Sequence, residues 1–208
     1  MRGVTRRRGG IGVALVFVAA WALAAASSSV VGVWLAIGGA AIVLGAATLL
    51  RAGGDVRAML VPSGRLVLVG LAAGLATIVA TYAIYPSLVS LAPSIVLEVE
   101  SLYAAFRAPS LTIAALALVP IILGEELVWR GAVQGSLAQR LGPRGGLAAA
   151  AGLYALATLP VGSPLLALAS LGLGLSWGAL RTMTSSLVPS LIAHATWNAV
   201  VLLWWPLG

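Results

Sequence analysis

Long apolar stretches separated by short polar connections make up most of this 208-residue chain. Most of these stretches approach the roughly 20 residues that an α-helix needs to cross a bilayer. The pattern therefore predicts an all-α protein, a polytopic transmembrane helical bundle of about seven spans. The expected spans cover residues 11–27, 30–50, 65–85, 109–139, 145–160, 164–180 and 186–205.

The composition supports a membrane protein. Hydrophobic residues make up 61% of the chain and charged residues only 8%, whereas a soluble domain usually has about a quarter charged residues. One helical bundle accounts for the whole length, so we expect no separate soluble domain. Residues 95–107 are expected to form a short amphipathic helix in the membrane interface.

The net charge of +7 comes from arginine alone, because the chain contains no lysine. One set of predicted connections, together with the N-terminal segment, holds Arg2, Arg6, Arg7, Arg8, Arg51, Arg57, Arg65, Arg140, Arg144 and Arg181. The opposite connections hold only Arg107, with Glu98 and Glu100. Because basic connections stay in the cytoplasm, we expect a multi-pass protein of the cell membrane with a cytoplasmic N-terminus. The bilayer, and not nucleic acid, is then the partner of the basic residues.

The first apolar stretch also has features of a secretory signal peptide, because basic residues precede it and small residues end it. A second apolar stretch begins at once, at residue 30. This continuity favours an uncleaved first span, with cleavage as the alternative.

The chain has no cysteine and one histidine, His194. Lack of cysteine excludes disulfides, thiolate catalysis and zinc sites built on cysteine. A single histidine excludes a two-histidine metal site within one chain. We therefore expect no cofactor, with a divalent metal such as zinc as the disfavoured alternative.

Three ionisable residues interrupt the fourth apolar stretch, where residues 124–131 read GEELVWRG. A charge within a bilayer costs at least about 2.5–3.5 kcal/mol, so each needs a partner or a wet cavity. Glu126 and Arg130 have the i,i+4 spacing of a helical salt bridge, which indicates a structural brace. Glu125 points about 100° away and is expected to remain unpaired in a poorly hydrated site, as suits a general base. The alternative is a clamp between helices without chemistry.

A second polar pair lies in the last apolar stretch. His194 and Asn198 are one helical turn apart, and both can donate a hydrogen bond to a developing oxyanion in a shared cavity. The alternative for His194 is a packing role. Tyr154 and Thr158 also share a helix face, and we expect the Thr158 hydroxyl to bond to the carbonyl of Tyr154 or Ala155. From the residues alone, this last stretch does not predict a site.

The two polar clusters resemble the motifs of the CAAX-protease and bacteriocin-processing (CPBP, or Abi) family of intramembrane glutamic or metallo-endopeptidases. Its members carry E-E-x-x-x-R, F-x-x-x-H and H-x-x-x-N on three membrane helices. Residues 125–130, EELVWR, match the first motif, and residues 194–198, HATWN, match the third. The resemblance covers roughly residues 105–205.

The resemblance implies a role for each matching residue. Glu125 would activate a water molecule, and His194 with Asn198 would hold the oxyanion. Glu126 and Arg130 would brace the site.

The second motif departs from the family pattern. Tyr154 stands where the family has phenylalanine, and Thr158 stands where it has the histidine that helps to activate the water. A threonine hydroxyl can hydrogen-bond a water molecule but cannot share its proton at neutral pH. In domain terms, the resemblance implies N-terminal transmembrane helices in residues 1–104 and catalytic-core helices in residues 105–208, within one integrated membrane domain.

The implied function is an intramembrane endopeptidase that hydrolyses a peptide bond of a membrane-associated protein or peptide with a glutamate-activated water. Its cavity is expected to open towards the cytoplasmic side, which is the side of the arginine-rich connections. Because of Thr158, a catalytically impaired member that acts as a membrane scaffold or immunity protein is the alternative. A transporter or proton relay is disfavoured, since the buried charges form one cluster and not a path across the bilayer.

Overall fold

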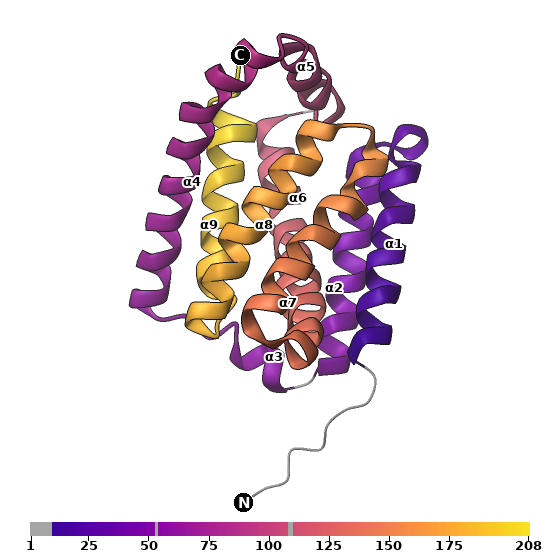
Figure 1. Ribbon diagram of the computed structural model, residues 1–208, viewed down its shortest axis with the longest axis vertical. Coiled ribbons are helices and arrows are strands. Elements are labelled where there is room, and N and C mark those ends of the chain that lie inside the picture. The colour runs from indigo at the N-terminus through magenta and orange to yellow at the C-terminus, as the bar shows by residue number, and fades with distance from the viewer. Residues whose placement is uncertain (1–9, 53, 108–109) are drawn as a thin grey trace, which may run out of the picture.

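The computed structural model describes residues 10–52, 54–107 and 110–208, which form a bundle of helices without strands (Figure 1). The predicted all-α fold class is confirmed. The α-helices are α1 (Gly10–Val31), α2 (Gly39–Ala52), α3 (Gly54–Ala58), α4 (Gly64–Leu91), α5 (Ile95–Ala105), α6 (Leu111–Glu126), α7 (Gln134–Thr158), α8 (Pro164–Thr184) and α9 (Val188–Asn198). Three π-helical segments, η1 (Trp34–Gly38), η2 (Leu127–Val133) and η4 (Ala199–Trp204), and a 3₁₀ turn, η3 (Leu159–Val161), complete the set.

Five helical stretches within the described residues are long and apolar enough to cross a membrane. They are Gly10–Val31, Trp34–Arg51, Gly64–Leu91, Leu111–Val161 and Pro164–Thr184, and the shorter Val188–Trp204 is also an apolar helix. The protein is therefore a multi-pass membrane protein.

The 51-residue stretch Leu111–Val161 contains a reversal at Gly142. Its φ of 74° and ψ of 171° are not helical, and glycine adopts such angles without steric cost. Gly146 packs against Ala138, although eight residues of a continuous helix would span about 12 Å. With this reversal, the helices account for the seven apolar stretches that the sequence predicts.

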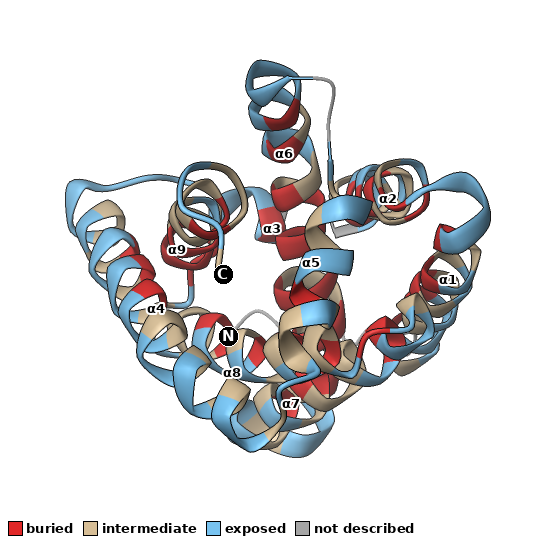
Figure 2. Cartoon of the chain, turned by 90° about the horizontal axis from the view of Figure 1, so that it is seen from above, coloured by how far each residue is buried: buried red, intermediate tan, exposed pale blue. Residues whose placement is uncertain are grey.

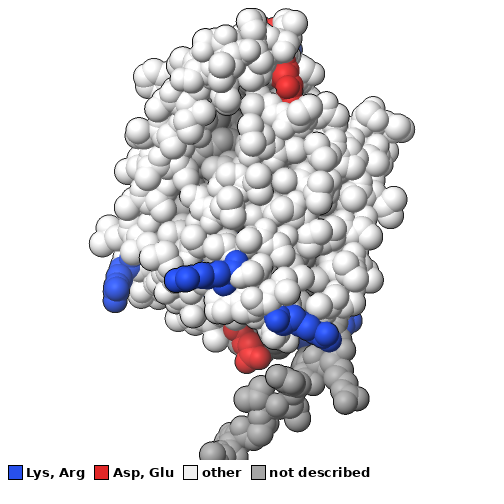
Figure 3. All heavy atoms as spheres, in the orientation of Figure 1, with Lys and Arg blue, Asp and Glu red and all other residues white. Residues whose placement is uncertain are grey.

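The two ends of the bundle differ in charge. We call one the α5 end, because α5 and the C-terminus lie there, and the other the arginine end (Figure 1). The arginine end carries the connections with Arg51, Arg57, Arg65, Arg140, Arg144 and Arg181. Figure 3 shows basic side chains gathered towards this end and a hollow in the half of the same face towards α5. The N-terminal arginines Arg2, Arg6, Arg7 and Arg8 lie outside the described residues.

Buried residues face the inside of the bundle, as the view from above shows (Figure 2). The main apolar cluster joins α1, α2, η2 and α7 around the fully buried rings of Trp21 and Trp129. Large apolar side chains such as Leu23, Leu68 and Leu116 remain exposed on the outer faces of their helices. An apolar outer surface around a core that contains the charges suits a protein surrounded by lipid.

Helices α2 and α6 cross where Gly45 of α2 meets Gly124 of α6. Gly124 directly precedes the acidic pair in the chain. A Cβ atom on Gly124 would lie 2.2 Å from the carbonyl oxygen of Ala41, and one on Gly45 would lie 2.6 Å from the Cα atom of Gly124. These contacts are with backbone atoms, which cannot move aside cheaply. The crossing therefore fixes where α6 presents Glu125 and Glu126.

Replacing Gly124 with alanine is expected to lower the free energy of unfolding by about 1–3 kcal/mol, because the new methyl group overlaps the backbone of α2. Thermal unfolding of the purified variant in detergent measures the effect. Gly152→Ala is the matched control, since a Cβ atom there has no neighbour within 4 Å. Equal stability of the two variants would contradict the close crossing.

Candidate active site

The acidic pair lies where α6 changes into the π-helical segment η2. Glu126 is completely buried, Glu125 is 9% exposed, and Arg130 is 2% exposed. π-Helical segments shift the phase of side chains and occur often at functional sites. Another π-helical segment, η4, begins directly after Asn198. The sequence pattern did not predict either segment.

Glu126 joins the arginine to the histidine. Its Oε1 atom lies 3.2 Å from Nη1 of Arg130 and 3.0 Å from Nδ1 of His194. The guanidinium lies off the hydrogen-bond direction, so its contact with Glu126 is an ion pair and not a directed hydrogen bond. The ion pair that the sequence predicts is therefore present, and the same carboxylate oxygen also contacts His194.

The ring of His194 is held in one orientation. Because a carboxylate can only accept, Nδ1 donates its hydrogen to Glu126. The Nε2 atom then points to the other acid and lies 3.6 Å from Oε2 of Glu125. Trp177 stacks on the imidazole, with ring centroids 4.0 Å apart and an angle of 21° between the planes.

Glu125 has partners of its own, so the expectation that it remains unpaired is wrong. The hydroxyl of Tyr154 donates to Oε2 of Glu125 over 3.2 Å, and the same oxygen faces His194. The tyrosine of the altered second motif therefore contacts the acid directly. Sequence reasoning missed this contact because the two residues lie on different helices.

Thr158 forms the bond that the sequence predicts. Its hydroxyl donates to the carbonyl oxygen of Tyr154 over 2.8 Å, and its side chain lines the same cavity as Glu125. Because the hydroxyl hydrogen is taken, the oxygen can only accept a hydrogen bond from a water molecule. Thr158 therefore supplies no second base.

Aromatic rings enclose the guanidinium of Arg130. Its Cζ atom lies 5.3 Å from the ring centroid of Tyr154 and 5.2 Å from that of Trp177. Both distances are within the range of cation–π attraction. Trp129 also packs against Tyr154, with ring centroids 4.6 Å apart. The sequence did not predict that Trp177 contacts His194 and Arg130. The one signal nearby is the spacing of Gly174 and Gly178, which allows another helix to approach closely.

A cavity of about 140 Å³ brings the predicted residues together. At about 10–15 Å³ for each water-sized probe, it has room for several water molecules. Five candidate residues line it, namely Glu125, Tyr154, Thr158, His194 and Asn198. Glu126 and Arg130 are not among the lining residues and so lie behind the wall.

The cavity extends towards the α5 end of the bundle. Its lining includes Val33, Trp34, Phe106 and Val161, which lie in or beside the connections at that end. The expectation of a cavity open on the side of the arginine-rich connections is therefore wrong. Connection sequences carry little information on which end of a bundle is packed shut, and this explains the error.

Two titratable side chains face each other at the cavity wall. Oε2 of Glu125 lies 3.6 Å from Nε2 of His194, and both residues line the space that has room for water. General acid–base chemistry requires such a group within reach of the proton that it transfers, directly or through one water molecule. The geometry therefore places an acid and an imidazole beside a space for water.

A metal site does not fit the described residues. Zinc normally takes three protein ligands, and no group of three His, Cys, Asp or Glu side chains that could hold a metal lies together in this part of the chain. Among the residues that line the cavity, only Glu125 and His194 belong to the residue types that usually bind zinc.

A comparison with known protein families gives a match to this chain. Residues 107–200 match the family model of the type II CAAX prenyl endopeptidase Rce1-like proteins. No curated protein and no solved structure gives a significant match. The fold is that of a polytopic membrane protein, and the match over residues 107–200 supports the CPBP family that the motifs predict. Helices outside the matched range still contribute Trp21 and Trp34 to the cavity wall.

Proposed function

We propose that the protein is an intramembrane endopeptidase that hydrolyses a peptide bond of a membrane-associated protein or peptide. The observation that carries the proposal is the meeting of Glu125, His194 and Asn198 at one cavity with room for water. The family match adds support, because that family consists of proteases. We place the protein in the cell membrane with its N-terminus in the cytoplasm, from the distribution of arginines.

In the first step, Glu125 takes a proton from a water molecule in the cavity. The hydroxide oxygen bonds to the carbonyl carbon of the substrate, and the carbonyl electron pair moves onto its oxygen. His194, through Nε2, and Asn198 donate hydrogen bonds to this oxyanion. When the tetrahedral intermediate collapses, the carbon–nitrogen bond breaks and Glu125 returns its proton to the leaving amine.

Glu126 and Arg130 act through His194 and do not touch the substrate. Glu126 accepts the hydrogen of Nδ1 over 3.0 Å, which directs Nε2 towards the reacting groups. A fixed donor stabilises an oxyanion better than a mobile one, because no reorganisation is needed during the reaction. The Tyr154 hydroxyl holds the carboxylate of Glu125 in a similar way.

Asn198→Ala is expected to lower kcat by about 10²–10³-fold with little change in KM, because the lost hydrogen bond forms fully only in the transition state. The assay uses purified protein in lipid vesicles with a library of fluorogenic peptides that carry an apolar membrane segment. Gln139→Ala, an exposed amide at the arginine end, is the control and should leave kcat unchanged. If KM rises and kcat stays constant, Asn198 contributes to substrate binding and not specifically to the transition state.

A second candidate function is a membrane scaffold that binds peptides without cutting them. The observation that favours it is the hydrogen bond of Thr158 to Tyr154, which leaves the second motif without a proton-sharing group.

The Thr158→His variant separates the two candidates in the same vesicle assay. If the proposal is correct, the parent already cleaves peptides, and the variant changes its rate. If cleavage begins only in the variant, the parent is a non-catalytic binder and the proposed function is wrong.

A further inference from the structure

The arginine end of the bundle is closed beneath the active site by apolar packing. Val56 of α3 is 5% exposed, and it packs with Leu127 and Leu187, which are 1% and 0% exposed. Met59 anchors this layer, because its carbonyl oxygen accepts hydrogen bonds from the amide of Leu187 and the hydroxyl of Ser186, each over 2.9 Å. The short helix α3 thus seals the bundle at this end.

A polar contact adds to the seal between α7 and α8. The side-chain amide of Gln134, which is buried, donates to the carbonyl of Gly178 and to the hydroxyl of Thr182, each over 2.9 Å. The ion pair of Glu126 and Arg130 is buried as well. A substrate that approached from the arginine end would have to displace all of these groups.

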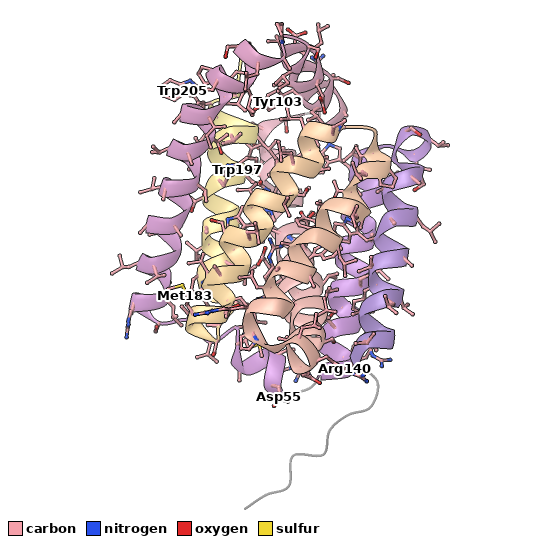
Figure 4. The ribbon with its side chains drawn as sticks, in the orientation of Figure 1. Asp55, Tyr103, Arg140, Met183, Trp197 and Trp205 are labelled. Atoms are coloured by element: carbon pink, nitrogen blue, oxygen red, sulfur yellow. The ribbon has the colours of Figure 1, made fainter. Side chains whose placement is uncertain are left out.

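The opposite end offers a way in. Trp34 and Phe106 meet edge to face at the cavity wall, with centroids 6.1 Å apart, and both side chains are partly exposed. Trp197 lines the cavity in the same half of the molecule, whereas Asp55 and Arg140 mark the closed end (Figure 4). The wall on this side is mainly aromatic and aliphatic, which suits an apolar peptide segment.

Helix α5 lies beside this entrance and is tied to two other helices. The Glu98 carboxylate accepts hydrogen bonds from the hydroxyl of Ser163, over 2.5 Å, and the amide of Leu165, over 2.7 Å, at the start of α8. The Tyr103 hydroxyl donates to the carbonyl of Val201 over 2.7 Å. These bonds fix Phe106, the residue directly after α5, at the cavity wall.

The charges indicate which compartment each end faces. Six arginines of the described residues lie in or beside the connections at the closed end, with Asp55, whereas the α5 end has Arg107 with Glu98 and Glu100. Basic connections remain in the cytoplasm during insertion. The closed end therefore faces the cytoplasm, and the entrance faces the other side of the membrane.

We infer that the substrate reaches Glu125 from the non-cytoplasmic half of the bilayer. Its class is a peptide or membrane protein with an apolar segment whose scissile bond lies in that half. A protein tail anchored in the cytoplasmic leaflet would have to displace the packed groups of the arginine end to reach the acids. This inference rests on the proposed function for the identity of the substrate, but the side of entry depends only on the cavity and the charges.

The chain has no cysteine, so a single introduced cysteine reports its own accessibility. Ser170→Cys places a thiol on the cavity wall, where Ser170 is 6% exposed. Ser101→Cys on α5 and Gln139→Cys near the arginine end are exposed references for the two sides. Each variant is treated with a small charged methanethiosulfonate reagent in intact cells and in inverted membrane vesicles.

Ser170→Cys and Ser101→Cys are expected to react in intact cells, and Gln139→Cys only in inverted vesicles. The inference would be overturned if Ser170→Cys reacted only in inverted vesicles, as Gln139→Cys is expected to do. It would also be overturned by a Ser170 variant that reacts from neither side but reacts fully after denaturation, since no open passage would then exist. Labelling requires no catalysis, so an inactive parent whose Ser170→Cys variant reacts from outside would refute the proposed function and leave the side of entry standing.

Discussion

Replacing Arg130 with methionine is expected to lower the free energy of unfolding by about 3–5 kcal/mol, because it leaves a buried carboxylate without its cation. Glu126 is completely buried and lies 3.2 Å from the guanidinium. The variant also removes the cation from between the rings of Tyr154 and Trp177. The change is measured by thermal unfolding in detergent, with the loss of the monodisperse fraction as the signal.

The double variant Arg130→Met with Glu126→Gln is the matched control. It removes both charges, and neutral groups of similar volume fill their space, so most of the lost stability should return. The amide oxygen of the new glutamine still accepts the hydrogen of Nδ1 of His194. If the single and double variants unfold at the same temperature, the ion pair is not what stabilises this part of the bundle.

The second large effect is expected from Glu125→Gln, which should lower kcat by about 10²–10⁴-fold, because an amide cannot take a proton from water. The amide keeps the shape of the side chain and can still accept from Tyr154. Stability should stay close to that of the parent, since the change removes no packing. Peptide cleavage in lipid vesicles and thermal unfolding are measured side by side.

Glu100→Gln is the control for this change, since it alters an exposed glutamate on α5 in the same way. It should retain the parent rate. A Glu125→Gln variant that unfolds readily would indicate that the carboxylate is structural, and one that cleaves at the parent rate would remove it from the chemistry.

The helices of this protein could be predicted from the sequence, because apolar length is a local property. The same holds for the ion pair of Glu126 and Arg130, which lie one turn apart, and for the bond from Thr158 to Tyr154. Such contacts depend on the helical period alone. They are set before the helices pack.

Contacts between helices could not be predicted in the same way. The bond between Glu126 and His194 joins positions 68 residues apart, and that between Tyr154 and Glu125 joins positions 29 residues apart. Spacing carries no information on which helix faces which. Motif resemblance did indicate that Glu125, His194 and Asn198 belong together, but it did not indicate the stacking of Trp177 on the imidazole.

The direction of the cavity is also a property of the packed bundle. It depends on α3, whose Val56 packs with Leu127 and Leu187 beneath the acids. The sequence of that connection shows turn residues and charges but not their contacts. In the structure the cavity therefore extends towards the end opposite to the expected one, although the expected residues still line it.

The most direct test of the account is hydrolysis by the parent protein in water enriched in ¹⁸O, with the products analysed by mass spectrometry. The account predicts one ¹⁸O atom in the new terminal carboxylate of the peptide, and about 10²–10⁴-fold slower formation of this labelled product by Glu125→Gln. Cleavage without incorporation of solvent oxygen, or equal rates of labelled product from the two proteins, would contradict a water activated by Glu125.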